Sequence, residues 1–409
     1  ATGKGNGGTV AVWSDGQTSF AGSISAKGGP KGGNGGQVET SGHNLGVAAS
    51  ATVDTSAPLG LTGDWLLDPV DLVITSCVSS QFCCGTTTCV DSSSIAASLS
   101  NTDVTQTATN SLTLDVNSDI TWNSINSLNL LSEGDIDINS SIQNAGTGGI
   151  NIIAGWDGST LSFSPTMAST VYGGGVNGVG NISVASAGSG IAVGSFGGQT
   201  ILAGHDIQLQ SNSGNVQIGY QGAGGGEIDL LAAHNLGLTT NATSTMVRVG
   251  NGGTGTSGAV QGDINIQADA IDLSANATQT SIIIGNAGAG GVTGEINITA
   301  NGALTLTQTA INSETVIGNG DLDVSTTGAV GGNVTVTAGS VAMTGNVSAQ
   351  ANIGNRGVGT VSGNLDIETT SGDLSLTAQD KGLAAIGNRV GAVDGANLVT
   401  GSASGNIIV

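Results

Sequence analysis

Carboxylates are the side chains in this sequence with the clearest potential for chemistry, because cleavage of a polysaccharide needs clustered acids, often beside a basic residue. The two densest acidic groups are Asp54, Asp64, Asp68 and Asp71, and Glu133, Asp135 and Asp137. Asp135 and Asp137 alternate with isoleucines, so we expect them on the solvent face of a strand, where they favour solubility. Asp68 and Asp71 are expected to cap turns. No Lys or Arg neighbours either group in the sequence, so this pattern favours a protein that is not an enzyme.

All four cysteines of the chain lie between positions 77 and 89: Cys77, Cys83, Cys84 and Cys89. Adjacent Cys83 and Cys84 are poor partners for each other because the small ring that they would close is strained, so Cys77 and Cys89 are their natural partners. In an exported protein this spacing predicts two disulfides that staple an exposed loop. A zinc site with four thiolate ligands is the competing interpretation, but such a site normally uses two separated Cys-x-x-Cys pairs.

Other side chains with ligand or acceptor chemistry indicate no bound group. His43, His205 and His234 are far apart in sequence without the spacing of metal ligands, so we expect turn or surface residues. The Gly-Gly-x-Gly-x-Asp repeat of calcium-binding β-rolls does not occur, and no cofactor is expected. Asn-x-Ser/Thr triplets are candidate glycosylation sites, although a chain rich in Asn, Ser and Thr forms them by chance. They begin at Asn139, Asn181, Asn241, Asn276, Asn297, Asn333 and Asn346.

A phrase that recurs over residues 226–409 must supply the elements that position these side chains. Each copy opens with Gly, an acidic or amide residue and an alternating strand, and it closes on an aliphatic-Gly-Asn step. A second short strand lies between, as at residues 303–306, so each copy predicts three short strands with Ile, Val and Leu on one face. The openings begin at Gly226, Gly262, Gly294, Gly332, Gly363 and Gly405, and the closings end at Asn251, Asn286, Asn319, Asn355 and Asn388.

One copy of this phrase cannot bury its apolar face alone. Stacked copies can, because equivalent strands pair about 4.8 Å apart and enclose a continuous aliphatic core. The sequence therefore predicts an all-β parallel β-solenoid with three short strands per coil and Gly-rich loops. The five closing asparagines then have two interpretations. They stack as an inward ladder of amides that bonds coil to coil, or Gly-Asn merely supplies left-handed turn residues.

The composition fits a solenoid better than a globular enzyme. The 409 residues include 71 glycines, are 2% aromatic and 9% charged, and carry a net charge of −22, whereas a globular enzyme has about a quarter charged residues. The seven basic residues form no patch, so nucleic-acid binding lacks its electrostatic basis. No apolar run reaches the roughly 18 residues of a membrane span, so the chain is not expected to span a membrane.

The first 74 residues carry a family resemblance. The segments VWSDG, GSISAKGG, GGNGGQVETSGHNL, VDTSAP and WLLDPVDLVI follow one another in one order. This composite closely resembles exoproteins of the filamentous-haemagglutinin and high-molecular-weight adhesin type, which leave the cell by two-partner secretion. The coils at residues 120–123 and 134–139 are similar to those that follow the phrase in that family. The resemblance implies a right-handed parallel β-helix on a cell surface, an outer-membrane transporter during export, and a receptor or glycan on a host or neighbouring cell.

We therefore expect three regions: the end of a secretion-domain-like β-helix at 1–74, a Cys-rich disulfide loop insertion at 75–110, and a repetitive shaft at 111–409. Within the shaft, residues 156–181 are expected to form a protruding loop. The chain starts within a coil and stops on a strand opening, which favours either part of a longer rod or head-to-tail filaments through uncapped ends. The expected function is a secreted or cell-surface, non-catalytic adhesin or structural fibre. The alternatives are a polysaccharide-active β-helix enzyme and a haem- or haem-carrier-binding exoprotein.

Overall fold

The structure is a computed structural model that describes residues 3–76, 88–158, 179–253, 255–320, 328–346, 348–379, 381–390 and 402–409. Strands make up 53% of it and helix 2%. The chain divides into two compact units, the first made of residues 1–182 with 201–205 and the second of residues 183–200 with 206–409. Both units are built on parallel ladders of strands. The predicted all-β class with parallel strands is confirmed, and the arrangement is compatible with a β-solenoid.

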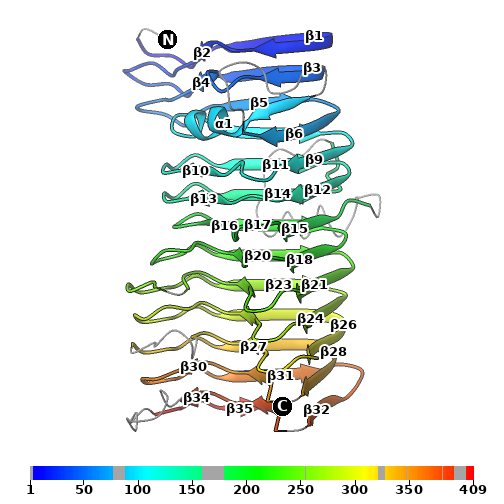
Figure 1. The fold of residues 1–409 in the computed structure, drawn as a ribbon. Coiled ribbons are helices and arrows are strands. Elements are labelled where there is room, and N and C mark those ends of the chain that lie inside the picture. The colour runs from blue at the N-terminus through cyan, green and yellow to red at the C-terminus, as the bar shows by residue number, and fades with distance from the viewer. Residues whose placement is uncertain are drawn as a thin grey trace. The chain divides into compact units, whose positions relative to one another are not determined.

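In the second unit, the copies of the recurring phrase stack as parallel ladders in register (Figure 1). The opening strands form one ladder from β20 (Ile228–Ala232) through β23 (Ile264–Ala268), β26 (Ile296–Gln308), β28 (Val334–Gly345) and β31 (Leu365–Thr369) to β35 (Ile407–Ile408). The second strands form another ladder, which runs through β18 (Ile207–Ser211), β21 (Asn235–Thr240), β24 (Ala270–Ala275), the later halves of β26 and β28, and β32 (Leu374–Ala378).

The closing strands form a third ladder, a separate sheet. In this unit it runs through β16 (Ile191–Ser195), β19 (Val216–Ile218), β22 (Met246–Val249), β25 (Ser281–Ile284), β27 (Glu314–Ile317), β29 (Gln350–Ile353) and β33 (Leu383–Ile386). Two shorter elements complete the unit, because β15 (Ile182–Ser186) pairs with β18, and β30 (Arg356–Gly357) pairs with β34 (Arg389–Val390).

The core of the second unit is a set of aliphatic columns, as the alternation in sequence predicts. Ile264, Ile296 and Val334 occupy equivalent places in successive opening strands, and each is fully buried. Ile284, Ile317 and Ile353 form the matching column in the closing ladder. Burial of one such side chain contributes about 1.5–3 kcal/mol. The stack therefore gains stability coil by coil and holds its surface residues at a regular spacing.

The first unit has the same parallel plan. Its main ladder joins β1 (Thr9–Phe20), β3 (Gln37–Val47), β5 (Asp64–Asp68), β8 (Asp103–Ala108), β11 (Leu128–Ser132), β14 (Ile150–Ala154) and β17 (Thr200–Gly204). A second ladder joins β6 (Asp71–Thr75), β9 (Ser111–Leu114) and β12 (Asp135–Ile138), and β7 (Cys89–Asp91) pairs with β3 and β6. Two pairs remain, β2 (Ser23–Ser25) with β4 (Thr52–Asp54) and β10 (Ile120–Trp122) with β13 (Ile142–Asn144).

The part of the expected loop insertion that the structure describes is regular. Helix α1 (Ser92–Ser98) follows β7 directly, and β8 then pairs in register with β5 and β11. The helix covers β4 with hydroxyls: the backbone N–H of Val53 donates to Oγ of Ser98 at 3.1 Å, and the Ser94 hydroxyl donates to the carbonyl of Ala51 at 2.8 Å. These side chains satisfy the backbone groups that a further strand would otherwise pair.

Candidate functional site

The closing asparagines of the second unit link each coil to the one before it. The backbone N–H of Asn251 donates to Oδ1 of Asn286 at 2.8 Å, and that of Asn286 donates to Oδ1 of Asn319 at 3.0 Å. The same bond joins Asn319 to Asn355 at 2.9 Å and Asn355 to Asn388 at 3.0 Å. The asparagines therefore stack and bond coil to coil, but each amide oxygen binds a backbone N–H and not another amide.

The amide nitrogen of each closing asparagine holds the two ends of a coil together. Nδ2 of Asn286 donates to the carbonyl of Gly262, which opens its own coil, at 2.7 Å, and to that of Thr293, just before the next opening, at 2.8 Å. The second acceptor lies 10, 7, 12, 7 and 16 positions after the five asparagines in turn. Each loop therefore starts and ends at one clamp whatever its length. We call this arrangement the asparagine clamp.

A row of left-handed residues lies on a different edge, at the turn before each closing strand. Five exposed residues other than glycine have positive φ there, two positions before the closing strand begins; they are Ser244 (58°), Gln279 (58°), Asn312 (54°), Ser348 (56°) and Lys381 (71°). In three of these turns the next residue, a Thr or Ser, donates its hydroxyl to the carbonyl three positions earlier at 2.7 Å. These bonds fix the turn, and the side chain of each left-handed residue projects to solvent.

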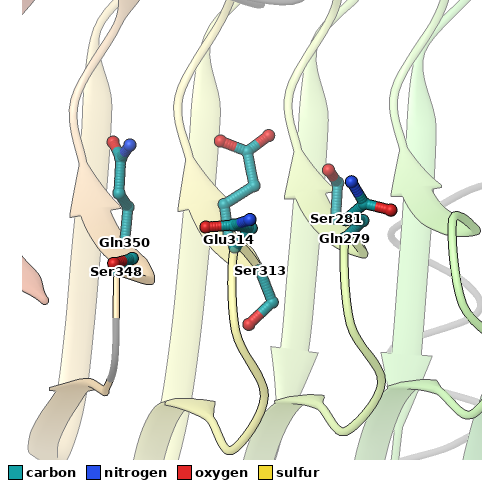
Figure 2. A pocket seen from close by; sticks show the side chains of 7 residues that line it. Gln279, Ser281, Ser313, Glu314, Ser348 and Gln350 are labelled. Atoms are coloured by element: carbon teal, nitrogen blue, oxygen red, sulfur yellow. The ribbon is translucent and has the colours of Figure 1, made fainter.

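The middle of this row lines a polar groove of about 330 Å³ that crosses three coils (Figure 2). Its lining is entirely polar: Gln279, Ser281, Asn312, Ser313, Glu314, Ser348 and Gln350. Ser281, Glu314 and Gln350 are paired in register as the first residues of β25, β27 and β29, and Figure 2 shows them on three neighbouring strands. The groove therefore presents hydroxyl, carboxylate and amide groups at the strand spacing, about 4.8 Å.

A buried arginine neutralises the one carboxylate in the lining. Nη1 of Arg356 is 2.7 Å from Oε2 of Glu314, and Nη2 is 3.4 Å from Oε1. The Arg356 side chain is fully buried and that of Glu314 is 17% exposed. Nη1 of Arg389 donates to Oε1 of Gln350 at 2.9 Å, so the Gln350 amide is turned with Nε2 as its remaining donor. The carboxylate of the lining is therefore paired, and Arg356 and Arg389 hold Glu314 and Gln350 from behind the groove.

A second group of polar side chains surrounds Asp229 on β20. Gln199 and Asn265 donate to Asp229 at 2.7 and 3.1 Å, and the same two amides donate to Glu227 at 3.2 and 2.7 Å. Asp229 is 2% exposed. Burial, with a smaller effect from the Glu227 charge, raises the pKa of Asp229 to about 6. Glu227 also lines a separate groove of about 550 Å³ with Asp263 and Glu295. A carboxyl group with a raised pKa beside a second carboxyl group is an arrangement that acid–base chemistry uses.

The acids singled out in sequence stay distributed along strands. Asp68 and Asp71 flank the turn between β5 and β6, where they accept hydrogen bonds from Thr107 at 2.6 Å and Ser111 at 3.1 Å on neighbouring strands. Asp135 and Asp137 are exposed between buried isoleucines, as predicted. Of the remaining acids, burial raises the pKa of Asp64 to about 6, while bonds from Lys27 and Ser56 outweigh burial and hold the pKa of Asp54 below its usual value.

The other predicted residues have varied outcomes. Cys89 is buried and is not a free thiol. Cys77, Cys83 and Cys84 lie outside the described residues, so the two predicted disulfides stay a prediction. Most of the expected loop at 156–181 also lies outside the described residues. His43 is exposed. Nδ1 of His234 lies 3.0 Å from Oδ1 of Asp206, a pair that the wide sequence spacing did not suggest.

The candidate glycosylation triplets fall on strands and turns. Asn241, Asn276 and Asn346 stand at the start of turns that lead to closing strands, while Asn297 and Asn333 lie along the opening ladder. Nδ2 of Asn297 donates to Oδ1 of Asn265 at 3.0 Å, and Oδ1 of Asn333 accepts from the N–H of Asn364 at 3.0 Å. Asn139 follows β12 directly, and Asn181 is exposed. Asn297 and Asn333 therefore already have a structural use in bonding neighbouring coils.

Neither a protein-family model nor a curated protein matches the sequence. Among the residues that the structure describes, no helix has the length and apolar character needed to cross a membrane.

Proposed function

We propose that this chain is a non-catalytic β-solenoid of the two-partner secretion class, which serves outside the cell as an adhesin or structural fibre. In this proposal the coils wind right-handed with three strands each, the ladders act as a spacer, and the loops and grooves make contact with a receptor or glycan on another cell. An outer-membrane transporter would carry the chain out of the cell. Head-to-tail assembly stays a prediction from the sequence.

The observation that supports this function best is the asparagine clamp. It keeps the ladders in register although the loop between clamp points varies from 7 to 16 positions. A scaffold of this kind separates stability from surface variation, because the core columns are unaffected by the loop length. That separation suits a protein whose surface must vary while its shaft stays constant.

A cell-binding experiment tests the proposal. Beads coated with the chain should bind epithelial cells or neighbouring bacteria in a saturable way, and excess soluble chain should compete. A variant with the loop between Asn251 and Gln261 shortened should fold normally and change the binding. If the folded chain binds no cell type in a broad panel, the adhesin function is wrong, and a purely structural role would remain to be tested by imaging the cell surface.

A second candidate, a polysaccharide-active enzyme, is favoured by one observation, the raised pKa of Asp229 beside the Glu227 carboxylate. In this alternative Asp229 donates a proton to the leaving oxygen, and Glu227 acts as base or nucleophile. Reducing-end release from a panel of polysaccharides would test it. Release by the parent that disappears in both Asp229→Asn and Glu227→Gln would establish this candidate over the adhesin.

A further inference from the structure

We propose that the polar groove over β25, β27 and β29 binds an extended, uncharged glycan that lies across the coils. The inference rests on the proposed function, since a protein on a cell surface is where such a ligand would be met. It assigns the contact to one surface of the second unit, with Gln279, Asn312 and Ser348 as its outer contacts and Ser281, Glu314 and Gln350 as its floor.

The electrostatics of the groove select an uncharged ligand. The Glu314 carboxylate is the acid of the lining, and Arg356 pairs with it from a fully buried position at 2.7 Å. Among the described residues no basic side chain lines the groove, and the chain as a whole carries −22 charges. The cations behind the lining, Arg356 and Arg389, are already bonded to Glu314 and Gln350. A sulfated or sialylated chain would therefore meet the negative field of the chain with both guanidinium groups engaged, whereas a neutral ligand pays no such penalty.

The chemistry of the lining selects a ligand rich in hydroxyl groups. Every lining side chain is a hydroxyl, an amide or the neutralised carboxylate, so the groove offers both donors and acceptors and no apolar platform. Sugar rings present hydroxyls around their rim that can both donate and accept. A hydrophobic peptide, in contrast, would bury these polar groups without hydrogen-bond partners, which weakens its binding.

The spacing of the lining selects an extended chain that crosses the strands. Equivalent side chains in adjacent coils recur at about 4.8 Å, which is comparable to the length of one sugar ring in an extended polymer. In an extended peptide, side chains on one face recur at roughly 6.6 Å, twice the rise per residue. A glycan can therefore make one equivalent contact per coil over the three coils that line the groove. The side chains of an extended peptide do not match the spacing of the coils.

Substitution by glycine provides a clean test, because the three outer residues have positive φ, a conformation that glycine adopts without strain. The variant Gln279→Gly/Asn312→Gly/Ser348→Gly removes the outer contacts and keeps the backbone. Asn117→Gly is the matched control, since Asn117 is exposed with φ 58° in the first unit and does not line the groove. Circular dichroism and hydrogen exchange verify that both variants stay folded.

The probes are neutral β-1,4-linked oligomers of glucose and of N-acetylglucosamine, from one ring to six, with a heparin fragment as the anionic comparison. Calorimetry on the full chain should show affinity that rises up to three rings and then levels off. The triple variant should lose about tenfold in affinity, as expected for the loss of about 1.4 kcal/mol, and the control should bind like the parent. Tighter binding of heparin, no binding of any neutral oligomer, or equal binding by the triple variant would each overturn the inference.

The same variants separate this inference from the proposed function. If the triple variant still binds cells like the parent and the parent binds no neutral oligomer, the groove assignment is wrong and the adhesin function stands. If the parent binds the oligomers through the groove but no cell type, the groove assignment stands and the adhesin function is wrong.

Discussion

The side-chain oxygen of Asn286 accepts a hydrogen bond from the backbone N–H of Asn251 at 2.8 Å, which joins the ends of two successive coils. The amide nitrogen of Asn286 bonds two backbone carbonyls at 2.7 and 2.8 Å. One fully buried side chain thus bonds three backbone groups, and the bond to the Asn251 N–H is itself buried. Several measurable consequences depend on this relationship and on its neighbours.

Replacement of Asn286 by Ala should destabilise the second unit by about 3 kcal/mol, because it leaves a buried N–H and two carbonyls unpaired. The effect should be local, since the stability of a stacked repeat comes mainly from each coil and its neighbours. Hydrogen exchange followed by mass spectrometry should show faster exchange at the peptide that contains Asn251. Asn301→Ala is the control, because Asn301 is exposed and its side chain donates to the exposed Asp269 at 2.7 Å. Unchanged exchange at Asn251 in the Asn286 variant would show that the clamp does not stabilise the coil.

Replacement of Gly285 by Ala should prevent close stacking of the closing turns. A Cβ atom at this position would lie 2.0 Å from the carbonyl oxygen of Gly318, which is backbone and cannot move away alone. We expect a loss of about 4 kcal/mol or more in the free energy of unfolding, or no folded protein at all. Gly291→Ala is the matched control, since its nearest atom, the carbonyl oxygen of Ala329, is 3.7 Å away. Urea unfolding compares the two, and equal midpoints would argue against close backbone packing at Gly285.

The stability of the second unit should depend on pH through Asp229. Its pKa rises from 3.8 in the unfolded chain to about 6 in the fold, so between these values the folded state keeps a proton that the unfolded state releases. The free energy of unfolding therefore decreases as the pH rises from about 4 to 6 and levels off above that range. Asp229→Asn should remove this dependence and gain up to about 3 kcal/mol at pH 7, the equivalent of two pKa units.

Thermal unfolding from pH 3.5 to 8 tests this expectation, with Asp263→Asn, directly before β23, as the control. Asp263 is exposed, and its replacement should leave the pH profile of the parent unchanged. A parent curve that rises between pH 4 and 6, with an Asp229 variant that rises in parallel, would contradict the assignment.

The ion pair behind the groove should be strongly coupled. Glu314→Gln removes the carboxylate that pairs with the fully buried Arg356 guanidinium and should cost on the order of 3 kcal/mol, because a buried charge loses an opposite charge that stabilises it. Arg356→Met alone should cost less, since Glu314 can reach solvent. The double variant should recover most of the loss, and a double-mutant cycle from urea unfolding gives the coupling directly. Additive effects would mean that the pair contributes little.

Residue patterns in the sequence predicted the repeating part of this architecture well. Alternation within the opening phrases placed Ile264, Ile296 and Val334 in one buried column, and the recurring Gly-Asn step marked the coil ends. The pattern could not tell what the amide of Asn286 would bond, because an inward side chain can reach either another amide or the backbone. In the structure the amide nitrogen reaches the backbone, where two carbonyls lie 2.7 and 2.8 Å away.

Elements without a periodic signal were missed. Helix α1 has a single buried aliphatic residue, Ile95, and its other buried residues are serines. The sequence therefore has no apolar stripe there that would predict a helix. The groove was missed for a related reason: its left-handed row is made of Ser, Gln, Asn and Lys, which differ from coil to coil, and not of conspicuous glycines. The Glu314–Arg356 pair joins residues 42 positions apart, a spacing that has no meaning until the coils are stacked.

The asparagine clamp also bears on how such a chain can change length over generations. Each coil brings both halves of its joint, an N–H offered to the following coil and an amide oxygen offered to the preceding one. A gene segment that encodes one whole coil can thus be duplicated or lost by unequal recombination. The coils at each new junction can then form the same hydrogen bond between closing asparagines as the original neighbours did.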